Sequence, residues 1–118
     1  MSASELEVEV RAKLKKKFDT HLSKDYVQIG VKSNGQPKTH QFDIVSPDRK
    51  IVGEVKSGKQ YDNVRFAECM LDCFYLTKVK DAEHCIFVLT NRWVYEGFIR
   101  DSDGLLEGIE VHLIELQK

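Results

Sequence analysis

The sequence of 118 residues contains no long apolar segment. A membrane-spanning helix needs roughly 20 consecutive apolar residues, and no run in this chain approaches that length, so no such helix is expected. The first residues are polar and acidic, whereas a secretory signal begins with basic residues followed by an apolar core. We therefore expect an intracellular, cytoplasmic protein that binds no membrane.

Cysteine is scarce as well, with three residues and no regular spacing. Cys69 and Cys73 lie in a segment that we predict to be helical, and Cys85 begins a predicted strand. This odd number without a pattern argues against a disulfide framework. A zinc site built from the three cysteines and His84 is one interpretation, but the chain has no CxxC pair. We favour the other interpretation, in which the thiols are buried and act as small apolar side chains.

Internal repeats, low-complexity segments and linkers are also absent from the sequence. Hydrophobic residues make up 42% of the chain and charged residues 31%, which is typical of a globular protein. Two domains of half this length would each be too small to bury a useful core. Residues 1–118 are therefore predicted to form a single domain.

The net charge of -1 hides an uneven distribution along the chain. Residues 1–60 contain 12 Lys and Arg against 8 Asp and Glu, whereas residues 61–118 contain 6 against 11. A polyanionic partner such as nucleic acid would therefore meet the N-terminal half. The basic run at Lys13 and 15–17 does not by itself indicate such a partner, because we interpret it as the solvated face of a helix.

The hydrophobic pattern predicts an alternation of helices and strands. Ser4 and Glu7 fit a capping box, and apolar residues follow them at four-residue spacing. The apolar run at 85–89 shows little polar alternation, which predicts a strand buried on both faces. The predicted elements are helix 4–22, strands 26–33, 40–45 and 50–57, helix 62–78, strand 84–90, an ambiguous segment 91–100 that we interpret as a short helix, and strand 109–116. This order predicts an α/β fold with a mixed sheet flanked by helices.

Asp43, Glu54 and Lys56 form the pattern that carries chemistry. Side chains alternate along a strand, so Glu54 and Lys56 would point to one face, about 7 Å apart. The opposite face would carry apolar side chains that pack on a helix, namely Ile44, Ile51 and Val55.

The register of the hairpin decides whether Asp43 joins Glu54. A two-residue turn is disfavoured because Pro47 cannot take the positive φ that such turns require. A four-residue loop would pair Val45 with Lys50. Counting inward from this pair places Asp43 diagonal to Glu54 on the same side of the sheet, whereas a three-residue loop would separate them.

Two convergent carboxylates and an ammonium group on a half-buried strand pair need partners, because burying a charge is costly. Such carboxylates suit a hard divalent cation such as Mg²⁺, which takes oxygen ligands and keeps waters that a phosphate can displace. The cation can lower the pKa of a bound water and neutralise charge on a phosphodiester. Lys56 would hold or deprotonate the attacking water, or offset phosphate charge. The alternatives are a surface ion pair of little worth and a structural ion network in an interaction domain.

Asp43, a hairpin and then Glu54-Val55-Lys56 resemble the motif of the PD-(D/E)XK nucleases, the restriction-endonuclease-like superfamily. The resemblance covers most of the chain as an α-β-β-β-α-β order of elements. Thr90-Asn91 and the final strand are similar to the small archaeal Holliday-junction resolvases and the modification-dependent restriction nucleases. Phe42 stands where the family has proline, and helix 62–78 lacks the glutamine-tyrosine motif of the RecB-like branch.

The resemblance implies an endonuclease that hydrolyses phosphodiester bonds in DNA with Mg²⁺ or Mn²⁺. It implies that Asp43, Glu54 and the carbonyl of Val55 bind the metal, and that Lys56 is the catalytic lysine. The alternative is a catalytically silent nuclease-like domain that binds nucleic acid or a protein partner.

Many members of this superfamily add a glutamate from the first helix to the site. We assign this role, as metal ligand and catalytic residue, to Glu9, with Glu5 on the preceding turn as the substitute. A favourable interaction of these acidic residues with the helix dipole is an equally simple explanation for both.

Residues beside the motif are expected to contact the sugar-phosphate backbone. Lys38 and His40, which precede Asp43, are two candidates for such contacts. His40 could instead act as a general base. For His40 we favour a third interpretation, a solvent-exposed residue at the end of a strand. The residues that follow the motif are Ser57, Lys59 and Gln60.

Aromatic residues near the C-terminal half allow two interpretations. Trp93, Tyr95 and Phe98 are suited to stack on a base, but core packing or a subunit interface is favoured. Because a chain of this size covers little duplex and one centre cuts one strand, we predict a homodimer. Its interface is predicted to use Trp93, Val94 and Phe98.

Overall fold

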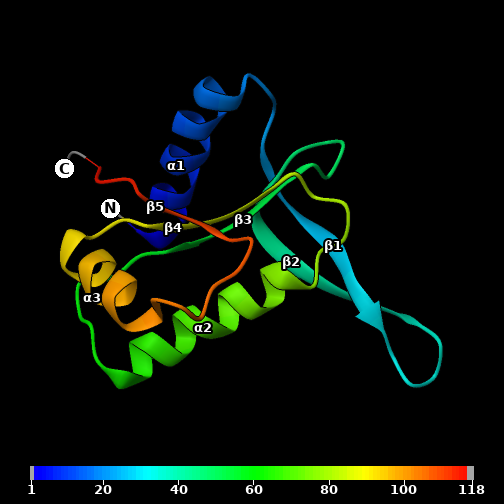
Figure 1. Cartoon of the computed structure of the whole chain (residues 1–118). Helices are drawn as coiled ribbons and strands as arrows, with labels where there is room; N and C mark the ends of the chain where they lie inside the picture. Colours follow the sequence, from blue (N-terminus) through cyan, green and yellow to red (C-terminus); the bar gives the residue numbers. More distant parts are fainter. Residues whose placement is uncertain (1, 117–118) are drawn as a thin grey trace.

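The computed structural model describes residues 2–116 as an α/β fold (Figure 1). A mixed sheet in the strand order β1-β2-β3-β4-β5 is antiparallel from β1 to β3 and parallel from β3 to β5. The elements are α1 (Ala3–Phe18), β1 (Ser23–Val31), β2 (Pro37–Val45), β3 (Ile51–Lys56), α2 (Asn63–Thr77), β4 (His84–Leu89), α3 (Arg92–Ser102) and β5 (Glu110–Leu113). The predicted α/β class, the mixed sheet and the type of every predicted element are thus confirmed. No helix within residues 2–116 is both long and apolar enough to cross a membrane.

The sheet lies between α1 on one face and α2 with α3 on the other (Figure 1). A layer of apolar side chains packs on each face. Strand β4 contributes to both layers, and its residues 86–89 are buried on both faces as predicted, whereas His84 and Cys85 are partly exposed. Ile86 and Val88 pack in the layer under α1, while Phe87 and Leu89 pack in the layer under α2 and α3. Strand β4 is therefore the centre of the core.

The N-cap of helix α1 lies two residues earlier than predicted. The chain contains the Ser-x-x-Glu pattern twice, and the structure uses Ser2 and Glu5 as the capping box in place of Ser4 and Glu7. The Ser2 hydroxyl accepts a hydrogen bond from the Glu5 amide at 3.2 Å, and the Glu5 carboxylate accepts one from the Ser2 amide at 3.0 Å. The helix ends at Phe18, short of the predicted position 22, because Asp19 adopts a left-handed conformation with φ of 52°.

The β2–β3 hairpin has a register two residues away from the predicted one. Val45 pairs with Val52 rather than with Lys50. Ser46 accounts for the difference, because its amide donates to the Ile51 carbonyl at 3.0 Å and its hydroxyl accepts from the Ile51 amide at 3.0 Å. A shift of two residues leaves every β3 side chain on its predicted face.

Strand β2 carries a β-bulge at Asp43. Between the pairs Ser23–Val45 and Asp25–Phe42, β1 has one intervening residue and β2 has two. The ladder between β2 and β3 ends at the pair of Ile44 with Gly53. From there the two strands diverge, and residues 26–42 of β1 and β2 extend away from the sheet as a hairpin arm (Figure 1).

Candidate functional site

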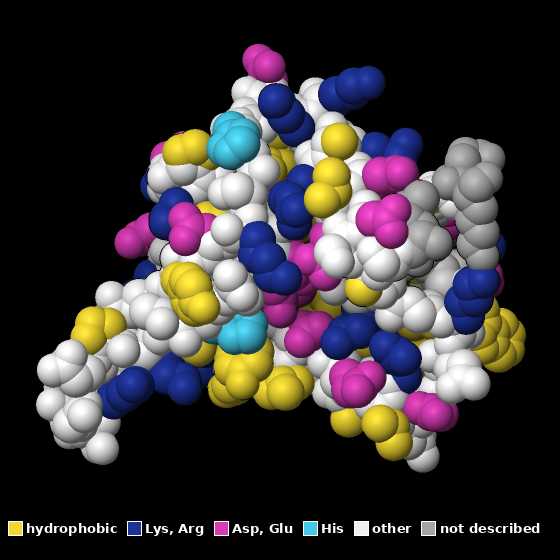
Figure 2. Space-filling view, turned by 180° about the vertical axis from the view of Figure 1, so that it is seen from behind, with side chains coloured by type: hydrophobic (Ala, Val, Ile, Leu, Met, Phe, Trp, Pro, Cys, Tyr) yellow, Lys and Arg dark blue, Asp and Glu magenta, His cyan; other side chains and the backbone are white. Residues whose placement is uncertain are grey.

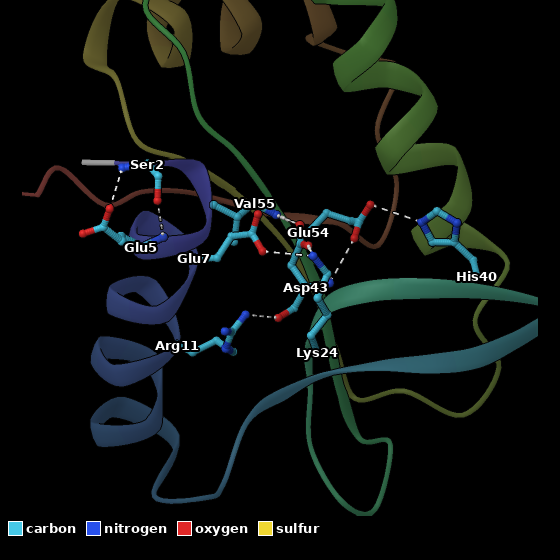
Figure 3. A network of polar contacts seen from close by, with 9 residues as sticks. All are labelled: Ser2, Glu5, Glu7, Arg11, Lys24, His40, Asp43, Glu54 and Val55. Atoms are coloured by element: carbon cyan, nitrogen blue, oxygen red, sulfur yellow. Dashed lines mark hydrogen bonds and ion pairs between the residues drawn. The ribbon is translucent and has the colours of Figure 1, made fainter.

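Asp43 and Glu54 meet at the point where β2 and β3 separate (Figure 3). The Asp43 amide donates a hydrogen bond to Glu54 Oε1 at 3.1 Å, and Asp43 Oδ2 accepts one from the Val55 amide at 2.9 Å. Each carboxylate thus bonds to the backbone of the other strand and replaces a ladder hydrogen bond that the divergence removes. The two carboxylates that the sequence singled out are held together in this seam.

Glu54 is the most strongly perturbed acid of the site. It is 6% exposed and lies on the same side of β3 as Val52, which packs under α2. Burial, followed by the negative charges of Asp43 and Asp72, raises the pKa of Glu54 to about 8. A buried carboxylate with two acidic neighbours has too little positive charge around it, and a bound cation would supply that charge.

A basic contact from the α1 side reaches Asp43 (Figure 3). Lys24 Nζ lies 3.3 Å from Glu7 Oε1 and 3.7 Å from Asp43 Oδ1. Arg11 Nη1 donates to the Asp43 carbonyl at 2.9 Å. These contacts fix the bulge of β2 against the first helix.

The helix glutamate linked to the site is Glu7, whereas the sequence pointed to Glu9, with Glu5 as its substitute. Glu7 and Arg11 are four residues apart and share the helix face that meets the sheet. Glu9 is two residues from Glu7, about 200° around the helix, and is exposed. Glu5 is held in the capping box by Ser2. Glu7 itself reaches Asp43 only through Lys24.

Lys56 has an acidic partner that the sequence did not reveal. Lys56 Nζ lies 3.2 Å from Oδ2 of Asp72 on α2. Burial raises the pKa of Asp72, opposed by the nearby Lys56 ammonium. The contact places the ammonium group under α2, on the face of β3 that also carries Glu54. Asp72 lies four residues after Glu68 on a helix of ordinary amphipathic pattern, so spacing alone could not identify it.

His40 lies inside the site rather than at a strand end. It is the fourth residue of β2, and its Nε2 lies 3.3 Å from Glu54 Oε2. Its ring stacks on Tyr75 of α2 with the centroids 4.2 Å apart. Burial lowers the pKa of His40, which favours the neutral imidazole. The sequence-based preference for a solvent-exposed role is therefore wrong.

The other predicted nucleic-acid contacts lie around the rim. Lys38 is exposed on the hairpin arm, and Lys59 and Gln60 are exposed in the segment that follows β3. The carbonyl of Ser57 accepts a hydrogen bond from Arg65 Nη1 of α2 at 3.2 Å. Figure 2 shows acidic side chains at the centre of this face, with lysine and arginine side chains around them and a histidine beside them.

Within residues 2–116, no group of three or more His, Cys, Asp and Glu side chains is arranged to hold a metal ion. The zinc interpretation for the cysteines therefore has no support, and Cys69 and Cys73 are buried free thiols as favoured. A Mg²⁺ site requires fewer protein ligands, because this ion is commonly held by one or two carboxylates and keeps several waters. Asp43 and Glu54 provide two carboxylates, which is the number and the type of ligand that such a site needs.

The predicted subunit interface is wrong in two of its three residues. Val94 and Phe98 are 2% and 0% exposed and belong to the core under α3. Trp93 precedes them on the outer face of α3 and is 67% exposed. The interpretation of Phe98 as a core residue is confirmed, and Tyr95 packs against the same cluster.

No family model, no curated protein and no solved structure matches this chain. The functional interpretation therefore depends on the geometry of the Asp43–Glu54 seam and its neighbours.

Proposed function

We propose that this chain is a metal-dependent nuclease that hydrolyses phosphodiester bonds in DNA, built on a restriction-endonuclease-like core. The observation that carries the proposal is the pairing of Asp43 with buried Glu54 where two strands diverge, with Lys56 on the same face of β3. A structural ion network would be expected to balance its charges, whereas Glu54 faces Asp43 and Asp72 in a site that favours its neutral form.

Asp43 and Glu54 would hold a Mg²⁺ or Mn²⁺ ion, and the carbonyl of Val55 remains the predicted third protein ligand. When bound, such an ion makes its water more acidic and neutralises charge on the phosphate. The Val55 amide holds one Asp43 oxygen and the Asp43 amide holds one Glu54 oxygen, so both carboxylates are oriented before any ligand arrives.

Lys56 would contact the attacking water or a phosphate oxygen. Its ammonium group is held by Asp72, which limits its motion. The ammonium would therefore act by orienting the water and by offsetting negative charge on the phosphate. His40, half-buried and tied to both Glu54 and Tyr75, would limit where Glu54 can move.

Plasmid nicking in Mg²⁺ or Mn²⁺ tests the proposal. We expect nicked product from the wild-type chain and none from Lys56→Ala, with Lys13→Ala as the control that removes an exposed lysine from the solvated face of α1. A fold check by circular dichroism should show that both variants keep the wild-type spectrum. Equal nicking by Lys56→Ala, or nicking that persists in EDTA, would contradict the assignment.

A second candidate is a silent nuclease-like domain that binds nucleic acid or a protein partner. The observations that favour it are the engagement of Lys56 by Asp72 and the absence, within the described residues 2–116, of a three-ligand metal group. Retention of DNA on the wild-type chain without cleavage in Mg²⁺, Mn²⁺, Co²⁺ or Ca²⁺ would select this candidate.

A further inference from the structure

A groove of about 500 Å³ lies beside the candidate site, between the hairpin arm and the C-terminal end of α2. Its lining combines aromatic, basic and acidic side chains from three separate segments. Residues that line it include Tyr26, Val27, Arg49, Lys78, Lys80 and Asp81.

The groove and the candidate site lie on the same face of the sheet. Val27 in the groove is the β1 partner of His40, and residues directly opposite on paired strands share a face. His40 in turn contacts Glu54 on β3 and stacks on Tyr75 of α2. A strand that leaves the Asp43–Glu54 seam across His40 and Tyr75 would therefore enter the groove.

The charge of the lining suits a phosphate backbone. Arg49, Lys78 and Lys80 stand against one acid, Asp81, whose carbonyl also accepts from Lys50 Nζ at 3.4 Å. Arg49 is held by Asp25 at 2.8 Å, which fixes its position in the wall. The two lysines after α2 are exposed and free to meet an anion.

An exposed aromatic ring lies at the rim of the groove. Phe74, next to Tyr75 on α2, is 53% exposed. Lys78 Nζ sits 5.0 Å from the centroid of the Phe74 ring and also lines the groove, so the ring lies at its rim. A basic groove with an exposed ring at its rim is an arrangement that binds unpaired bases by stacking.

We propose that this groove binds an unpaired nucleic-acid strand that leaves the candidate site, so that the substrates are DNAs with a single-stranded segment next to the cleavage position. This inference rests on the proposed nuclease function. A volume of about 500 Å³ is too small for a double helix, whose major groove alone is about 12 Å wide. Phe74 stacks a base at the rim, and Lys78 and Lys80 contact phosphates.

Binding is measured in EDTA by fluorescence anisotropy, so that it does not depend on cleavage. The probes are labelled oligothymidylate, a blunt duplex, and the same duplex with a 5′ or a 3′ tail. We expect the double variant Lys78→Glu with Lys80→Glu to bind oligothymidylate at least ten-fold more weakly and to lose the advantage of tailed over blunt duplex. The control is Lys15→Glu with Lys16→Glu on α1, an equal change of charge away from the groove, which should keep that advantage.

A second pair of variants isolates the stacking contact. Phe74→Ala should weaken oligothymidylate binding several-fold, whereas Leu71→Ala, an equally exposed apolar residue one turn earlier, should not. Equal losses on tailed and blunt DNA for the groove variants would overturn the inference, as would identical behaviour of the two lysine pairs. The inference would also fail if the surface bound a protein partner and both Phe74→Ala and Leu71→Ala released that partner.

If tail binding is found but no DNA is ever cut, the proposed function fails and the groove assignment stands. If blunt duplex is cut and tails give no advantage, the groove assignment alone fails.

Discussion

At the scale of single residues, Glu54 couples the candidate site to stability. Its pKa of about 8 in the folded chain lies above the ordinary value of 4.5, so the folded state holds this proton more tightly than the unfolded state. The resulting stability is fully present below about pH 4.5 and is lost as the pH rises through about 8. Above that pH a buried negative charge remains beside Asp43 and Asp72.

Glu54→Gln should remove this part of the pH dependence. In EDTA at pH 9, we expect the variant to exceed the wild type in free energy of unfolding by about 1–3 kcal/mol, the usual cost of a buried polar group without adequate partners. Urea denaturation at pH 5 and pH 9 measures the difference, and Glu9→Gln on the exposed face of α1 is the control. A stability gap between Glu54→Gln and the wild type that is equal at both pH values would contradict this account.

Asp72 is expected to act as a positioning residue for Lys56. Asp72→Asn keeps the shape of the side chain but removes the charge that holds the ammonium at 3.2 Å. Because a small misplacement of a catalytic group is costly, we expect kcat for DNA cleavage to fall by about 10–100-fold. KM should change little, and Asp72→Glu should restore part of kcat. The matched control is Glu68→Gln, one turn earlier and exposed on the same helix; an equal loss in both variants would refute the positioning role.

At the scale of elements, the packing of β3 against β4 depends on Gly53. A Cβ atom at this position would lie 2.7 Å from the Ile86 carbonyl oxygen and 3.1 Å from Ile44 Cδ1. Gly53→Ala must therefore push the two central strands apart directly beside Glu54. We expect a loss of about 1–3 kcal/mol in the free energy of unfolding, as for other overpacked cores.

Gly30→Ala provides the matched control in a strand, since a Cβ atom there meets nothing within 4 Å. Thermal unfolding should separate the two variants clearly. If Gly53→Ala unfolds at the same temperature as Gly30→Ala, the close approach of β3 and β4 is not as described.

The elements were predictable from the sequence because apolar periodicity is a local signal. The buried strand β4 follows directly from the apolar run that includes Phe87. Helix α2 was predicted from the helical spacing of apolar residues such as Val64, Leu71 and Phe74. The helix is there, but these three side chains are exposed, and its buried residues are Cys69, Cys73 and Leu76. The first residue of α1 was not predictable, because two capping patterns overlap and either one fits. The bulge at Asp43 was invisible as well, since it depends on Lys24 and Arg11, which reach β2 from other segments.

The candidate site was predictable only in part, because sequence patterns show local neighbours and not contacts made by tertiary packing. Asp43, Glu54 and Lys56 lie close together in the sequence, and strand parity placed the β3 pair correctly despite the wrong hairpin register. Asp72 and Glu7 approach through tertiary packing, from helices that show no unusual pattern at these positions.

At the scale of the whole molecule, one such centre can cut one strand, so the homodimer remains our prediction. Multi-angle light scattering should give twice the chain mass of 13.6 kDa. Trp93 is the predicted interface residue that stays exposed, and Trp93→Ala tests whether it takes part. A monomeric mass in a sample that retains cleavage would contradict the prediction.

The claim that the seam between β2 and β3 binds a divalent cation is tested most directly by a crystal structure with Mn²⁺. We predict one anomalous peak that contacts oxygens of both Asp43 and Glu54, at roughly the 2.0–2.3 Å of carboxylate–metal bonds, and no peak there in Glu54→Gln. Crystals that show Mn²⁺ elsewhere but none between these two carboxylates would contradict the account.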